Sequence, residues 1–93
     1  MYFSVSEATH LSNYKIQIAF QNGKSGIADL EDYISEGEIY QNIRNPDTFK
    51  NFSIEFGTLT WENGEVDIAP ETLYEITTGE KISFNYEKTY KVV

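Results

Sequence analysis

Residues 61–74 read WENGEVDIAPETLY and carry the most specific run of structural signals in the chain. Asn63 and Gly64 form a turn dipeptide, because both residue types accept a positive φ at low cost. Pro70 lacks an N–H and has a preset φ, which suits the first position of a helix. Glu71 then falls in the first turn, where the helix dipole favours a negative charge. The stretch therefore predicts the end of a strand, a tight turn and the start of a helix.

The same stretch predicts how the helix is capped and what it covers. The carboxylate of Asp67 is expected to accept backbone N–H bonds from the residues that follow it. Ala69, Leu73 and Ile76 are spaced to give the helix a narrow apolar face. Trp61 is the only tryptophan, and we expect it to anchor the core under that helix. The residues that we take as the structural signature are Trp61, Asn63, Gly64, Asp67, Pro70, Glu71, Leu73 and Tyr74.

The pattern W-x-N-G-x-D-I-A-P-E-x-L-Y resembles the hallmark of a small bacterial family, domain of unknown function 2442. An alternating strand that ends in FQNGK, residues 20–24, is similar to the family, as are Asp29, Phe49 and Phe52. The resemblance covers about residues 3–76. This chain has G-E-V-D where we expect the commoner spacing to be one residue shorter, and the longer turn should keep the fold.

The resemblance implies a fold and no activity. Members of the family are α+β domains; some are fused to a helix-turn-helix, and some are suspected of belonging to toxin–antitoxin-like pairs. No activity is established for the family, so the resemblance implies none for this chain.

Alternating apolar residues predict two hairpins. Residues 14–20 alternate cleanly, and an Asn-Gly turn closes them onto residues 24–29. A shorter strand is expected within residues 2–9, broken by residues 10–13. Asn45-Pro46 should start a short helix that bears Phe49. Residues 52–56 alternate as another strand, which a glycine turns into residues 58–61, where Leu59 and Trp61 continue a buried face.

These elements predict the α+β class: a small antiparallel sheet of two hairpins plus a C-terminal strand, with short helices packed on it. Residues 1–80 should form a single small domain. Residues 81–93 form a C-terminal strand extension, in which apolar side chains alternate with one interruption at Lys88. This strand can join the edge of its own sheet or pair with another chain, which would make a homodimer through residues 81–93. The candidate interaction edge consists of Phe84, Tyr86 and Tyr90.

The charge is strongly negative and unevenly distributed. The formal net charge is −8, with −10 on residues 1–80 and +2 on residues 81–93. Such a balance argues against direct binding to nucleic acid or to an anionic membrane surface. The chain contains no cysteine, which fits a reducing cytoplasm, and no signal peptide or membrane-spanning segment is evident.

An acidic stretch at residues 29–38 has two interpretations. Its oxygen-rich composition could suit a hard cation such as calcium, but the spacing lacks an EF-hand pattern. We favour a short helix capped by Asp29 that buries Leu30, Tyr33 and Ile34 and leaves its carboxylates in solvent. The residues of the candidate interaction surface here are Glu31, Asp32, Glu36 and Glu38.

Sequence motifs give no reason to expect an enzyme, a cofactor or a metal. His10 is the only histidine, and no phosphate-binding loop is present. We therefore expect a protein-interaction or regulatory module, antitoxin-like in the family's suspected context, that binds a basic protein or itself. The alternative is a small-ligand-binding domain with a pocket between the sheet and the Pro70 helix. An acidic mimic of nucleic acid fits less well, because the C-terminal segment is basic.

Overall fold

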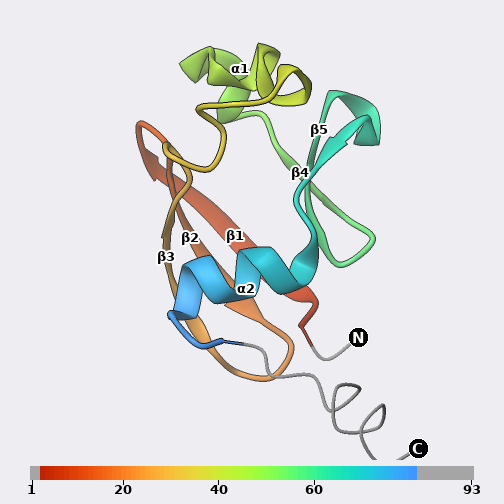
Figure 1. Ribbon diagram of the computed structural model, residues 1–93. Coiled ribbons are helices and arrows are strands. Elements are labelled where there is room, and N and C mark those ends of the chain that lie inside the picture. Colours follow the sequence, from red (N-terminus) through yellow and green to blue (C-terminus); the bar gives the residue numbers. More distant parts are fainter. Residues whose placement is uncertain (1–2, 82–93) are drawn as a thin grey trace, which may run out of the picture.

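The structure, a computed structural model, describes residues 3–81, which form two three-stranded antiparallel sheets with short helices (Figure 1). The first sheet contains β1 (Val5–Ser12), β2 (Lys15–Phe20) and β3 (Ser25–Asp29) in that order. The second contains β4 (Ser53–Glu55), β5 (Thr58–Trp61) and β6 (Val66–Asp67). The helices are η1 (Glu38–Tyr40), η2 (Asn42–Arg44), α1 (Pro46–Phe49), η3 (Glu62–Gly64) and α2 (Pro70–Thr78). The predicted α+β class is confirmed, and the predicted C-terminal strand lies outside the described residues.

The central strand of the first sheet, β2, alternates buried and outward residues as predicted. Ile16, Ile18 and Phe20 are buried, and the residues between them face outward or are half-buried. The predicted break at residues 10–13 is wrong, because β1 continues to Ser12 and His10 pairs with Ile16. The turn comes only at Asn13, which adopts a positive φ of 47°.

The second sheet is built on β5, whose four residues are all buried. The glycine turn between β4 and β5 is confirmed, and Phe56 and Gly57 have φ of 53° and 77°. The strand at residues 52–56 is also confirmed in its centre, but it does not continue the buried face. Ile54 is 41% exposed and Phe56 is 88% exposed, because β4 is the edge strand of this sheet.

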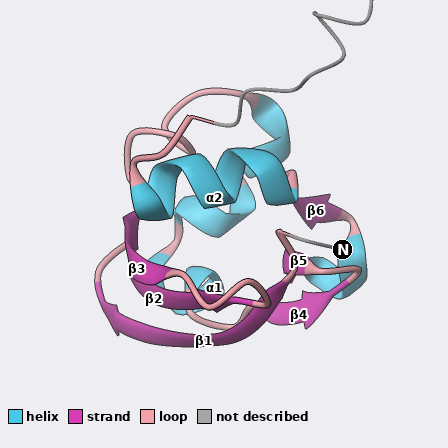
Figure 2. Ribbon diagram, turned by 90° about the horizontal axis from the view of Figure 1, so that it is seen from below, coloured by secondary structure: helices cyan, strands magenta, loops and turns pink. Residues whose placement is uncertain are grey.

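Helix α2 covers one face of the first sheet (Figure 2). Pro70 occupies its first turn as predicted, and Gly79, with a φ of 78°, ends it by donating its N–H to the carbonyl of Glu75. The predicted cap from Asp67 is wrong: Asp67 pairs with Thr60 in β6, and α2 has no side-chain cap. Proline at the first position already removes one of the four N–H groups that have no partner within the helix.

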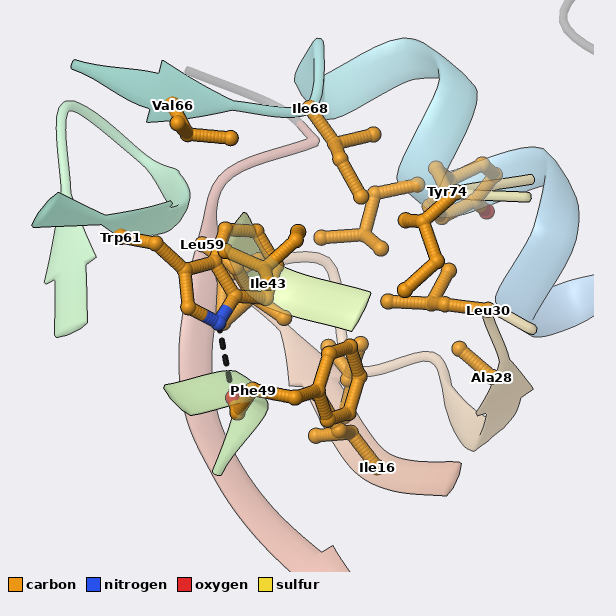
Figure 3. Packing of buried hydrophobic residues seen from close by; sticks show 14 of the residues in the cluster. Ile16, Ala28, Leu30, Ile43, Phe49, Leu59, Trp61, Val66, Ile68 and Tyr74 are labelled. Atoms are coloured by element: carbon orange, nitrogen blue, oxygen red, sulfur yellow. Dashed lines mark hydrogen bonds between the residues drawn. The ribbon is translucent and has the colours of Figure 1, made fainter. Parts of the chain in front are cut away.

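Trp61 is buried in the core, as predicted, at the end of β5. It is 1% exposed, its ring stacks on Phe49 at 5.6 Å, and its Nε1 donates to the Phe49 carbonyl at 2.7 Å (Figure 3). Its aromatic partners are therefore Phe49 of α1 and Phe52, whose ring meets the indole edge to face at 6.4 Å. The side chains of Ile68 and Leu73 complete the core towards α2.

Candidate interaction surface

The acidic segment, residues 29–38, follows β3 as an irregular loop that is fixed at both ends. Its first carboxylate, that of Asp29, accepts the N–H of Glu31 at 3.1 Å. Leu30 and Ile34 are buried, and one helical bond joins the N–H of Ile34 to the carbonyl of Leu30 at 3.0 Å. The prediction of a short helix here is wrong: only two overlapping turns form, closed by this bond and by the N–H of Ser35 on the Asp32 carbonyl at 3.2 Å, and Tyr33 is 38% exposed rather than buried.

Arg44 holds the far end of the acidic segment in place. Its Nε donates to the carbonyl of Ile34 at 2.6 Å and its Nη2 donates to the carbonyl of Gly37 at 2.7 Å. The hydroxyl of Tyr14 donates to the carbonyl of Arg44, which ties this arginine to the first sheet. A cation therefore fixes the loop through backbone carbonyls and leaves the carboxylates free to face solvent.

The four predicted acidic residues of this segment are exposed. Neither ion pair that the structure shows within residues 3–81 involves them; these pairs are Lys24–Glu80 and Lys50–Asp47. Exposed carboxylates outside an ion pair raise the local negative potential, which attracts a basic partner. The exposed acidic residues of the segment are Glu31, Asp32, Glu36 and Glu38.

Apolar side chains that sequence reasoning assigned to no site lie beside these carboxylates. The rings of Tyr33 and Tyr40 are 5.5 Å apart and their hydroxyl oxygens are 3.5 Å apart. Ile39, next to Tyr40, is 56% exposed. Burial, the contact with Tyr33 and the negative charge of Asp67 raise the pKa of Tyr40 to about 12, so its hydroxyl stays protonated at neutral pH.

The second sheet adds further acids to this surface. The side chain of Asn42 donates to the Glu62 carboxylate at 3.0 Å, and Asp67 lies near enough to Tyr40 to affect its pKa. These contacts join positions twenty or more residues apart, so no local pattern could have predicted them. We call the combined surface the acidic face; it consists of Glu31, Asp32, Tyr33, Glu36, Glu38, Ile39, Tyr40, Glu62 and Asp67.

The predicted structural signature is split by the fold. Trp61, Leu73 and Tyr74 are buried in the core, while Asn63 and Gly64 form the β5–β6 turn with φ of 59° and 89°. Pro70 and Glu71 start α2, and Asp67 belongs to the acidic face. The predicted interaction edge, Phe84, Tyr86 and Tyr90, lies outside the described residues.

The space between α2 and the first sheet is filled by side chains. A Cβ added to Gly26 would meet the Thr77 carbonyl at 2.5 Å, and Tyr74 packs on Phe20 with ring centroids 5.0 Å apart. Two cavities of about 220 Å³ lie elsewhere: one on the outer face of the first sheet, the other beside the acidic segment. The second is lined by Tyr14, Glu31, Ile34, Ser35 and Arg44. The predicted ligand pocket under α2 therefore gains no support.

Within residues 3–81, no group of three or more His, Asp and Glu side chains is arranged so that it could hold a metal ion. No helix in this part of the chain has the length and apolar character needed to cross a bilayer.

Comparison with known proteins identifies a family. The model of the family described as "Protein of unknown function (DUF2442)" matches residues 5–88. The match extends past residue 76, where the resemblance was expected to end, into the C-terminal segment. No curated protein and no solved structure matches the chain. Because the matched region covers most of its length, the chain belongs to the DUF2442 family.

Proposed function

We propose that this protein is a cytoplasmic, non-catalytic interaction module that binds a basic protein partner through the acidic face. The toxin of a toxin–antitoxin-like pair is one such partner. The observation that carries the proposal is the anchoring of the acidic segment by Arg44, which holds exposed carboxylates next to the exposed Tyr33 and the half-buried Tyr40.

Each component of the acidic face has a use in recognising a basic surface. The carboxylates attract lysine and arginine side chains and speed encounter. Tyr33 and Tyr40 offer ring faces on which an arginine can stack, with a neutral hydroxyl that can donate or accept a hydrogen bond. Since Arg44 already fixes the loop, binding requires little ordering of the backbone. Tyrosine is also enriched among the residues that carry most of the binding energy at protein interfaces.

The experiment begins with the tagged full-length protein, recovered from its own host at low salt, and mass spectrometry of the proteins that accompany it. The affinity for the protein recovered is then measured for three chains: the unchanged chain, the triple variant Glu31→Gln, Glu36→Gln and Glu38→Gln, and a control. The control, Glu7→Gln, Glu55→Gln and Glu71→Gln, removes the same charge from other surfaces and likewise changes one residue in the first turn of a helix.

We expect a basic partner whose dissociation constant rises about tenfold in the triple variant, because three exposed ion pairs contribute about 1.5 kcal/mol together. The control should bind within about twofold of the unchanged chain, and the affinity should fall as salt is added. Equal weakening by the two sets of substitutions would show that only net charge matters and would contradict the proposed face. Recovery of no basic protein would contradict the function itself.

A further inference from the structure

The free edge of β3 is the most regular unpaired strand edge in the described structure. β3 pairs with β2 over all five of its residues without a register shift, and no strand within residues 3–81 pairs with its other side. The other edges are less suited to strand addition. β1 contains two register shifts, its first N–H already donates to the carbonyl of Gly57, and β4 has three residues. Short strands and bulges are devices that discourage strand addition, and β3 has neither a bulge nor an edge proline.

Three residues of β3 direct their backbone groups away from the sheet. Lys24 and Leu30 bond towards β2, since the Lys24 carbonyl accepts from Phe20 and the Leu30 N–H donates to Tyr14. The direction of these groups alternates along a strand, so the N–H and C=O of residues 25, 27 and 29 point outward. Ile27 is 55% exposed on the open face of the sheet, which gives an added strand an apolar side chain to cover.

Glu80, one of the last residues that the structure describes, lies beside the beginning of β3. Lys24 Nζ and the Glu80 carboxylate are 2.7 Å apart, and Tyr74 donates to the same carboxylate at 3.2 Å. The remaining residues, 82–93, alternate apolar and polar side chains and include two lysines. Residues 81–93 carry +2 and the rest of the chain −10, so this segment is complementary in charge to the acidic segment that follows β3.

Pairing of this segment with β3 of its own chain is disfavoured by handedness. In Figure 1, α2 lies in front of the first sheet, β3 runs upward from the hairpin at residues 21–24, and its free edge is on the left. A parallel strand added there, after a connection that crosses the front of the sheet, would make a left-handed crossover. About 98% of such crossovers are right-handed. An antiparallel strand would first have to pass the length of β3 and turn, which leaves only about half of residues 82–93 for pairing.

We propose that residues 82–93 of a second copy of this chain add to the free edge of β3, so that two copies exchange their C-terminal segments in a symmetric dimer. In such a dimer each copy is both donor and acceptor, and the contact closes with two-fold symmetry. The backbone of β3 supplies the hydrogen bonds, and Ile27 and the lysines of the incoming segment supply side-chain contacts. The dimer is independent of the basic partner proposed above, because its contact is the strand edge and not the acidic face.

Position 27 allows a sharp test in the full-length chain by sedimentation equilibrium. Ile27→Pro removes an outward N–H and blocks the edge, yet leaves the bonds between β2 and β3 intact, and edge strands tolerate proline. Ile27→Thr is the matched control, because it loses the same apolar side chain and keeps the N–H. A second variant, Phe84→Pro with Tyr86→Pro, disrupts the donor segment and leaves β3 unchanged.

We expect the unchanged chain and Ile27→Thr to be dimers. The dissociation constant of Ile27→Pro should be higher by about a hundredfold or more, because the symmetric dimer loses the bond twice. The doubly substituted segment should weaken the dimer similarly. An equimolar mixture of these two defective chains should form a heterodimer through one intact contact, between the segment of the first chain and the edge of the second, and this heterodimer should be weaker than the unchanged dimer.

Several results would overturn the proposal. A full-length chain that stays monomeric at the highest protein concentration that sedimentation equilibrium can reach would overturn it. A dimer whose dissociation constant is unchanged by Ile27→Pro would also overturn it. A monomer whose amide at residue 27 is protected from hydrogen exchange would show that the segment pairs within its own chain. If the circular dichroism spectrum shows that Ile27→Pro does not fold, the Phe84→Pro, Tyr86→Pro chain decides the question instead. A dimer that persists in that chain would equally contradict the exchange of C-terminal segments.

Discussion

The central strands of the two sheets, β2 and β5, are stabilised in different ways. In β2 buried and outward residues alternate, and one face of its sheet is open to solvent. In β5 all four residues are buried, and two of them are threonines. A strand covered on both sides must satisfy its polar side chains internally. Accordingly, Thr58 donates its hydroxyl to the carbonyl of Ile68 and Trp61 donates its indole N–H to the carbonyl of Phe49. The first sheet thus depends on its alternating pattern, and the second on specific buried hydrogen bonds.

The largest effect should come from removing the bond and the volume of Trp61 together. Trp61→Phe leaves the Phe49 carbonyl without its donor and opens a cavity in the core, so we expect the free energy of unfolding to fall by about 2–4 kcal/mol. Gln17→Ala, on the outward face of β2, should change it by less than about 0.5 kcal/mol. Urea denaturation followed by circular dichroism measures both. A loss at Trp61 no greater than that at Gln17 would remove the contrast between the two strands.

A smaller effect isolates the hydrogen bond from the volume. Thr58→Val keeps the shape of the side chain but leaves the Ile68 carbonyl without its donor, and it should lower the free energy of unfolding by about 1–2 kcal/mol. Thr9→Val makes the same chemical change on the exposed face of β1 and should fall within about 0.5 kcal/mol of the unchanged protein. The two variants are compared by the midpoint and slope of urea unfolding. If the two variants lower the free energy of unfolding by the same amount, the stability of β5 does not depend on the hydrogen bond of Thr58.

The contrast between a strand with one open face and a strand buried on both faces also limits how much of the fold could be predicted from the sequence. Residues 14–20 alternate because one face of β2 meets the core, so strand and burial could both be predicted. At residues 52–56 the same alternation predicts the strand but not its burial. Whether Ile54 and Phe56 meet the core depends on the position of β4 at the edge of the second sheet, which is a property of the topology.

Only part of the candidate site could be predicted from local sequence patterns. The exposed carboxylates of the acidic segment could be predicted from composition, since acidic runs are usually solvated. The segment was expected to be helical because Leu30, Tyr33 and Ile34 have helical spacing, and Arg44 instead takes up the carbonyls of Ile34 and Gly37. An arginine in a later helix gives no local signal of that contact. For the same reason, the contribution of Glu62 and Asp67 to the acidic face could not be predicted.

The turns that join β1 to β2 and β4 to β5 offer a third comparison, with an effect of opposite sign. Asn13 follows β1 with a φ of 47°, and Phe56 follows β4 with a φ of 53°. Asparagine tolerates the left-handed region better than phenylalanine, and the Phe56 side chain, 88% exposed, loses little burial when replaced. Phe56→Asn should therefore raise the free energy of unfolding by about 0.5–1 kcal/mol, and Asn13→Phe should lower it by a similar amount. Thermal unfolding of the two variants gives the signs; a destabilised Phe56→Asn would show that this ring makes a stabilising contact.

The smallest effect concerns the exposed contacts that close α2 onto the first sheet, in contrast to the buried bonds of β5. Hydrogen bonds from Lys24 and then from Tyr74 lower the pKa of Glu80 from its ordinary value of 4.5. Because the folded pKa is lowered, the stabilisation is present above pH 4.5 and is lost as the pH falls through the folded value. The pair is exposed to solvent, so added salt should weaken it.

Carboxyl ¹³C shifts of Glu80, followed from neutral to acid pH, measure this contact directly. Lys24→Met should raise the titration midpoint towards 4.5, and Tyr74→Phe should raise it by less, because the lysine bond has the larger influence on the pKa. At about 1 M salt the midpoints of the unchanged chain and Lys24→Met should converge, since the Debye length is then about 3 Å. A midpoint that is the same in the unchanged chain and in Lys24→Met at low salt would mean that Lys24 does not hold Glu80 in solution. The chain after α2 would then not be held to the beginning of β3 by an ion pair. The exposed Lys24–Glu80 contact of the first sheet could then no longer be compared with the buried hydrogen bonds of the second.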